Sequence, residues 1–120
     1  MDDQRCILHI CKRAVWEAAL QVGSYEGDTL ASEGFIHCST SEQVVDVADC
    51  RFKGVRDLLL LVIDPRQVRP EVKYEEAANG QHYPHIYGPL NIDAVVSAVA
   101  FPPQADGTFR LPDLGGATGV

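Results

Sequence analysis

An uninterrupted apolar run near the middle of the chain constrains the fold more than any other feature. Residues 57–64 read DLLLLVID, and every residue from Leu58 to Ile63 is apolar. A strand with one face in water alternates apolar and polar residues, whereas a strand buried on both faces does not. The run therefore predicts a central strand covered on both sides, which Pro65 ends.

The flanking segments predict further strands and two main helices. Before the central strand we expect, in chain order, a strand at 6–11, a helix at 12–22, an exposed loop at 24–33, a strand at 35–39 and a helix from Ser41 to about Phe52. After it we expect a short strand at 72–75, a loop at 78–83, a compact turn-containing segment at 85–90, and a turn followed by a strand through 97–101. This order indicates an α/β or α+β fold, with too few late helices for a doubly wound sheet.

The size and charge of the chain narrow the classes of protein that it can belong to. At 120 residues it predicts one domain, at residues 1–101, followed by a weakly ordered tail at 102–120. The net charge of −7 argues against binding to nucleic acid or to anionic lipid. No segment is apolar enough to span a membrane, and the acidic N-terminus is not typical of a signal peptide, so a cytoplasmic location is expected. The four cysteines are then expected to be buried thiols.

Two histidines lie on the first two predicted strands. Because side chains alternate between the faces of a strand, each strand has one apolar face and one mixed face, which carries His9 or His37. If both mixed faces line one cleft, the two imidazoles can approach the same ligand. Ser39 shares a face with His37 and can bind a ribose or another polar group. The alternative is structural, with hydrogen-bonded histidines and Ser39 as a helix cap.

A second group of candidate residues follows the central strand. His85 and Tyr87 lie, together with His82, in a segment that mixes aromatic rings, imidazoles and turn residues, as in a pocket wall that stacks on a planar group. Glu75 or Glu76, at the end of a short strand, can stabilise a cationic transition state. The alternatives are a structural turn and a pair of solvated carboxylates.

Metal and hydrolase sites are weaker interpretations. Histidine and cysteine at 9, 11, 37 and 38 are metal-ligand types, but they lack the paired CxxC or HxxxH spacing of zinc sites. Ser39 has no base and orienting acid at the spacing of a catalytic triad. Neither a dinucleotide-binding GxGxxG motif nor a Walker loop is present.

Several of these motifs together resemble a known family. The blocks GFIHCST at 34–40 and PHIYGPL at 84–90 are specific, and LHI at 8–10, WEAA at 16–19 and LLLVIDP at 59–65 accompany them. They are similar to the bacterial domain of unknown function 952 over about residues 6–101. The resemblance implies the ADP-ribosylation superfold, an α+β fold in which two small, bent sheets flank a nicotinamide-dinucleotide cleft.

A more distant resemblance points to the RNA 2′-phosphotransferases of that superfold. Residues 36–39 (IHCS), 62–64 (VID) and 79–80 (NG) follow the order of their motifs. However, Phe35 replaces the first histidine of their His-x-His block, and the arginines of this chain match no phosphate-binding set. The resemblance to the superfold implies NAD as a cofactor or substrate. It also implies a ribose contact for His9, a place on the adjoining cleft strand for His37 and Ser39, and the role of the supporting carboxylate for Glu75 or Glu76. With the pocket wall inferred above, the predicted site has His37 and Glu75 as catalytic residues and His9, Ser39, His85 and Tyr87 as ligand contacts.

The sequence thus predicts a cytoplasmic domain whose histidine-lined cleft binds a nucleotide-like ligand, NAD or ADP-ribose. ADP-ribosyl or phosphoryl transfer is the chemistry that the resemblance suggests. The first alternative is a non-catalytic ligand-sensing or protein-interaction module, which the unmatched arginines favour. The second is a metal-binding protein that uses thiols and imidazoles.

Overall fold

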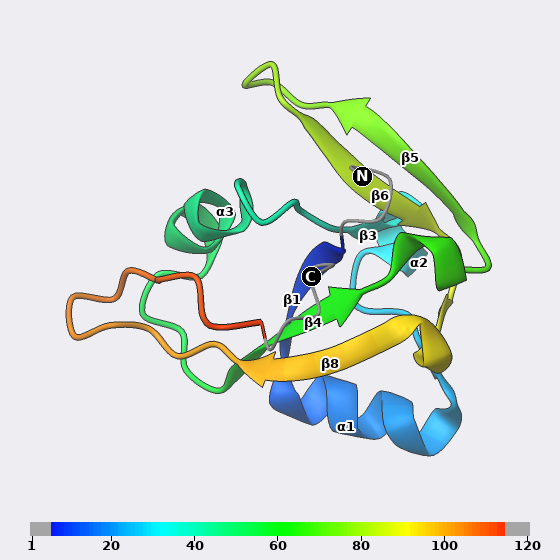
Figure 1. Ribbon diagram of the computed structural model, residues 1–120, viewed down its shortest axis with the longest axis horizontal. Helices are drawn as coiled ribbons and strands as arrows, with labels where there is room; N and C mark the ends of the chain where they lie inside the picture. The colour runs from blue at the N-terminus through cyan, green and yellow to red at the C-terminus, as the bar shows by residue number, and fades with distance from the viewer. Residues whose placement is uncertain (1–5, 115–120) are drawn as a thin grey trace.

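The central strand of the protein is β4 (Leu58–Ile63), as the apolar run predicts. The structure is a computed structural model that describes residues 6–114. β4 lies between β1 (Ile7–Lys12) and β8 (Val95–Ala100) and pairs antiparallel with both (Figure 1). All six residues of β4 are buried, which confirms that this strand is covered on both sides.

Each face of β4 packs into its own buried cluster. Alternate residues of β4 point to opposite faces, so the strand divides the core in two. The first core cluster contains Leu59, Leu61 and Ile63, together with Ile7, Cys11, Trp16, Ala19, Tyr25, Ile36, Cys38, Ile86, Leu90 and Ala94. The second core cluster contains Leu58, Leu60 and Val62, together with Cys6, Leu8, Ile10, Val44, Ala48, Phe101, Phe109 and Leu114.

Helix α1 (Arg13–Val22) covers the first core cluster. Its buried residues are Trp16 and Ala19, which lie three positions apart on one helical face. The helix ends at Gly23, whose φ of 97° is in the left-handed region, and the N–H of Gly23 donates to the carbonyl of Ala19. The predicted helix and its glycine stop are confirmed.

Helix α3 (Val44–Arg51) covers the second core cluster through Val44 and Ala48. It begins three residues later than predicted. The side-chain oxygen of Gln43 accepts the N–H of Thr40 at 3.0 Å, and the Thr40 carbonyl accepts from both Gln43 and Val44. These bonds hold residues 41–43 in a turn, so Ser41 does not start the helix.

The segment expected to be a loop at 24–33 contains two short elements. β2 (Ser24–Tyr25) pairs with β7 (Leu90–Asn91), and α2 (Leu30–Glu33) follows. The prediction was wrong because Tyr25 is only 2% exposed and packs into the first core cluster. A single buried aromatic residue holds this otherwise polar segment against the core.

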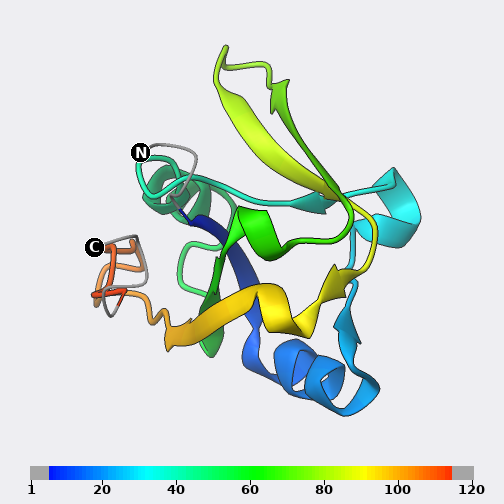
Figure 2. The same ribbon diagram turned by 45° about the vertical axis from the view of Figure 1, so that its right-hand side comes forward.

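A second three-stranded sheet contains β3 (Ile36–His37), β6 (His82–Tyr87) and β5 (Glu71–Glu76), in that spatial order. β5 and β6 form a hairpin that projects away from α1 (Figure 2). β6 includes residues predicted as a loop at 82–83 and as a turn-containing segment at 85–87. The prediction failed there because β6 pairs along its whole length with β5, and this pairing overrides local preference.

The chain passes from one sheet to the other immediately after β3. The N–H of Cys38 donates to the carbonyl of Pro84 in β6 at 2.9 Å. The next residue, Ser39, exchanges two backbone hydrogen bonds with Leu8 in β1, at 2.7 and 2.8 Å. One short segment thus joins the two three-stranded sheets.

Two short 3-10 helices complete the described elements. η2 (Pro65–Gln67) follows β4, where the Asp64 side chain accepts the N–H of Arg66. η3 (Ile92–Ala94) directly precedes β8, as expected for a turn followed by a strand. The predicted α+β class is confirmed, whereas the relation to the ADP-ribosylation superfold stays a prediction.

Residues 102–114 pack against the second core cluster. Phe109 is 4% exposed, its ring centroid lies 4.9 Å from that of Phe101, and its N–H donates to Asp49 at 2.7 Å. Leu114 is also buried. The first part of the predicted tail at 102–120 therefore contributes to the core, and its Gly-rich end at 115–120 lies outside the described residues.

We expect Phe109→Ala to lower the free energy of unfolding by about 3 kcal/mol, because it removes a large buried ring and leaves a cavity. Urea unfolding followed by circular dichroism measures the change. Leu111→Ala is the control, because Leu111 is 41% exposed, and its effect should stay below about 1 kcal/mol. Equal, small effects of both substitutions would mean that residues 102–114 do not stabilise the domain.

Candidate functional site

The outer face of the second sheet carries four of the six predicted site residues. His37 lies opposite His85 in the β3–β6 pair, and Lys73 lies opposite His85 in the β5–β6 pair. Ile36, Ile86 and Cys38 point from the same strands into the first core cluster, so the alternating side chains point away from it. We call the resulting group the histidine face; its members are Glu33, Phe35, His37, Lys73, Glu75, His85 and Tyr87.

Glu75 binds two donors on this face. The Nδ1–H of His85 donates to Glu75 Oε1 at 2.7 Å, and the hydroxyl of Tyr87 donates to the same oxygen at 2.5 Å. The bonds from Tyr87 and His85 hold the pKa of Glu75 below its usual range. The Glu75 carboxylate in turn raises the pKa of Tyr87. Glu75 is therefore an ionised acceptor that orients an imidazole and a phenol, leaving Nε2 of His85 outside this bond.

His37 has a carboxylate partner of its own. Its Nε2 lies 3.0 Å from Oε1 of Glu33, at the end of α2. The His37 side chain is 38% exposed and that of Glu33 48%. Two imidazoles, each paired with a glutamate, therefore occupy one face.

The Phe35 ring packs against both imidazoles. It stacks on His85 with centroids 4.2 Å apart and an interplanar angle of 14°, and it meets the edge of His37 at 4.8 Å. The rings of His37 and His85 are themselves 5.1 Å apart. Lys73 adds a cation, with Nζ 5.1 Å from the centroid of Tyr87. The face thus combines aromatic rings, carboxylates and one ammonium group.

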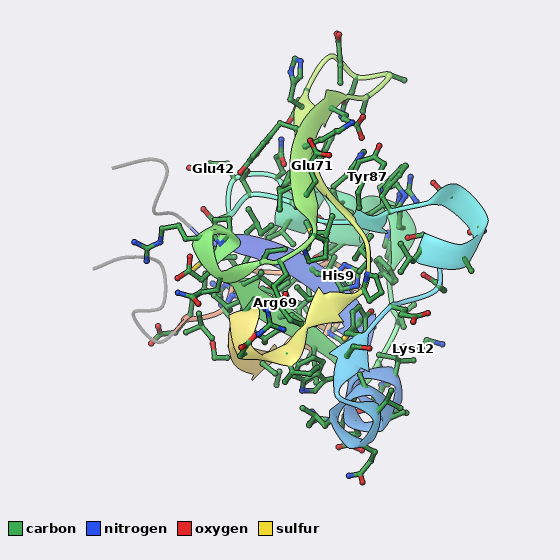
Figure 3. The ribbon with its side chains drawn as sticks, turned by 90° about the vertical axis from the view of Figure 1, so that its right-hand side faces the viewer. His9, Lys12, Glu42, Arg69, Glu71 and Tyr87 are labelled. Carbon is green, nitrogen blue, oxygen red and sulfur yellow. The ribbon has the colours of Figure 1, made fainter. Side chains whose placement is uncertain are left out.

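His9 lies apart from the histidine face. In Figure 3 it lies on β1 near the middle of the molecule, whereas Tyr87 is on the hairpin above it. His9 Nδ1 donates to the main-chain carbonyl of His37 at 2.5 Å, and His9 Nε2 accepts from the Tyr25 hydroxyl at 2.7 Å. Both ring nitrogens therefore have protein partners.

This environment keeps the His9 ring neutral. Burial, which disfavours the charged form, lowers the pKa of His9 to about 4, against smaller opposing contributions from its bond to His37 and from Asp28. The His9 ring contacts His37 through the main-chain carbonyl and not through the imidazole, and a cleft shared by the two rings stays a prediction. His9 ties β1 to β3 and to Tyr25.

Ser39 and His82 are also separate from the histidine face. Ser39 is 5% exposed, and its backbone pairs with Leu8. His82 alternates with His85 along β6, so its side chain shares a face with Pro84 and not with His85. The His82 carbonyl accepts a bond from Gln43 at 2.9 Å. These positions give Ser39 and His82 structural contacts in the described fold.

Sequence reasoning did not assign three members of the histidine face to a site: Glu33, Phe35 and Lys73. Alternation alone places Phe35 beside His37. Glu33 precedes His37 by four residues, but the turn at Gly34, with φ of 91°, brings the two together. Lys73 depends on the pairing of β5 with β6, which the sequence does not reveal.

Among residues 6–114, no group of three or more histidine, cysteine, aspartate or glutamate side chains is placed to hold a metal ion. Burial raises the pKa of the Cys11 thiol to about 11 and that of Cys38 further. None of the helices described there is long and apolar enough to cross a membrane. A shallow cavity of about 350 Å³, lined by Arg56, Asp57 and residues 102–105, contains no predicted site residue.

The chain belongs to the family described as "Protein of unknown function (DUF952)", whose model matches residues 10–98. This confirms the family that the sequence motifs predict. It assigns no activity, and no curated protein matches the chain.

Solved structures of one protein, CC0527 from Caulobacter crescentus, are similar to this chain. Its crystal structure is 33% identical, covers 88% of this chain and 94% of its own, and superposes with a TM-score of 0.82. Its solution NMR structure is 34% identical, covers 88% and 92%, and has a TM-score of 0.78. The similarity extends over nearly the whole of both chains, so it includes both sheets.

We expect the neutral state of the partly buried His9 to make stability depend on pH. The folded pKa of about 4 lies below the ordinary value near 6.5, so the unfolded chain binds the proton first as pH falls. The His9 contribution is complete at neutral pH and decreases below pH ~6.5, by about 2 kcal/mol at pH ~5. Urea unfolding of the wild type and His9→Gln at both pH values measures it. An equal pH dependence in the two proteins would contradict the assignment.

Proposed function

We propose that the histidine face binds the nicotinamide–ribose end of NAD, or a nucleotide-like ligand with a similar planar, cationic ring. The observation that carries the proposal is the combination of Phe35, Tyr87 and the ionised Glu75 on one accessible face. Aromatic rings attract planar cations through their π-electrons, and a carboxylate adds an opposite charge. The motif resemblance to the ADP-ribosylation superfold suggests the same ligand class.

The charges of the histidine face favour binding of the nicotinamide–ribose end of NAD over binding of its phosphates. Glu33 and Glu75 belong to the face, and Glu71 lies close enough to Tyr87 to raise the pKa of the phenol. Phosphates placed near these carboxylates would be repelled. Lys73 is the cation of the face, so the pyrophosphate is expected on its side. ADP-ribose, which lacks the nicotinamide cation, should therefore bind more weakly than NAD.

The same groups suit ribosyl transfer if the domain is catalytic. When the bond between nicotinamide and the ribose C1′ breaks, its electron pair stays on the nicotinamide nitrogen and positive charge develops on the ribose. Glu75 supplies negative charge for that state. His37 or His85 would take the proton of the attacking hydroxyl as general base. A non-catalytic sensing module would bind the ligand in the same way. The hydrogen bonds that His85 and Tyr87 already donate to Glu75 favour this alternative over catalysis.

Titration of the ¹⁵N-labelled protein with NAD⁺, NADH and ADP-ribose tests the proposal by amide chemical shifts. We expect the largest shifts at His37, His85 and Tyr87, with NAD⁺ binding more tightly than NADH, whose ring is neutral. Phe35→Leu and Glu75→Gln should each weaken NAD⁺ binding about tenfold, equivalent to ~1.4 kcal/mol. His82→Ala, on the other face of the same hairpin, is the matched control and should bind as the wild type does.

Two results would contradict the proposal. The first is the absence of shifts on the histidine face at millimolar NAD⁺, and the second is equal binding of NAD⁺ and NADH. An assay of nicotinamide release, monitored by chromatography, distinguishes the catalytic hypothesis from the non-catalytic one. Release that is lost in Glu75→Gln supports ribosyl transfer, whereas binding without release supports a sensing module.

A further inference from the structure

β8 lies at the border of its sheet and has one open edge. Its only strand partner among residues 6–114 is β4. The N–H of Phe101 donates to Leu58 at 3.0 Å, so the backbone groups of Phe101 point toward β4. In an antiparallel strand these groups alternate in direction from one residue to the next. Ala98 and Ala100 therefore point their N–H and C=O groups away from the sheet.

The side chains along this edge are apolar or small and carry no charge. β8 reads VVSAVA; Val96 is 54% exposed, and Ala98 and Ala100 are exposed too. Proteins usually protect an exposed edge strand with charged side chains, since open backbone groups invite another strand. β5, the long edge strand of the other sheet, is protected in this way, because its EVKYEE sequence contains three glutamates and a lysine.

The contrast between the two edges indicates the partner. The chain carries a net charge of −7, so two copies repel each other wherever acidic surfaces meet. Pairing of β5 with a second β5 would bring glutamates together. The β8 edge is the neutral one of the two, and it can meet its own counterpart without opposing like charges.

We propose that β8 pairs antiparallel with β8 of a second copy, around a two-fold axis at Ala98. Ala98 then lies opposite its own counterpart, and Val96 lies opposite Ala100. This register matches the outward-pointing groups of Ala98 with those of its own counterpart, and it brings Ala100 opposite Val96, where β8 carries a β-bulge. A shift by two residues would place Pro102, which has no N–H, in the ladder.

The pairing produces one continuous six-stranded sheet in a closed dimer, with the order β1-β4-β8-β8-β4-β1. Ala98 and Ala100 lie beside Leu61 and Leu59 of β4, on the face that α1 covers. A two-fold axis perpendicular to the sheet places both α1 helices on that same face. The histidine face lies on the other sheet and is not needed for the pairing.

Light scattering coupled to size-exclusion chromatography tests the proposal with the full chain. The wild type should have twice the chain mass of 13.1 kDa. Ala98→Lys and Ala98→Glu should each be monomeric, because each places like charges directly opposite one another. An equimolar mixture of the two variants should recover the dimer, because the opposed charges then attract. Tyr74→Lys, which adds the same charge to an exposed position of β5, should remain dimeric.

Circular dichroism of each variant separates loss of pairing from loss of folding, and recovery in the mixture shows that both variants fold. A monomeric wild type at high micromolar concentration would overturn the proposal. A dimer that persists in Ala98→Lys would show that another surface forms the interface. Failure of the mixture to pair would exclude the register at Ala98.

Discussion

The backbone pairing of Ser39 with Leu8 is the interaction on which the rest of the structure depends. Residues 36–38 hydrogen-bond to β6 of the second three-stranded sheet. Ser39 hydrogen-bonds to β1, which belongs to the sheet that contains β4. The His9 ring strengthens this junction by donating to the His37 carbonyl from β1. Because both sheets contribute to the first core cluster, their relative position also determines how that core packs. The side chain of His37 is consequently held in place by buried backbone contacts.

The elements that the sequence predicts well are those whose signal is local. β4 is apparent from its continuous apolar run, and α1 from its periodicity and the glycine that ends it. β2 and β6 were missed because their structure depends on distant partners: Tyr25 reaches the first core cluster, and β6 pairs along its length with β5. The late start of α3 follows from the Gln43 side chain accepting the N–H of Thr40. The Thr-x-x-Gln spacing at 40–43 is the pattern of such a cap, so this boundary had a local signal that the prediction from Ser41 did not use.

The candidate site was likewise predictable only where its sequence signal is local. Alternation along two segments places Phe35 with His37 and His85 with Tyr87, but only the β3–β6 register brings these pairs together. His9 satisfies the same alternation rule, yet its ring bonds the main chain of His37 and the Tyr25 hydroxyl, and not a side chain of the histidine face. Periodicity thus identifies the face of a strand on which a residue lies. Tertiary pairing decides which faces meet.

The position of the histidine face, outside both core clusters, has a consequence for how such proteins diverge. Its side chains point away from the buried residues that stabilise the fold, so replacing them removes little buried apolar surface. The residues of this face can accordingly change between relatives at low thermodynamic cost, while the scaffold underneath persists. An engineer could use the hairpin in the same way, as a surface on which new recognition chemistry is installed without redesigning the interior.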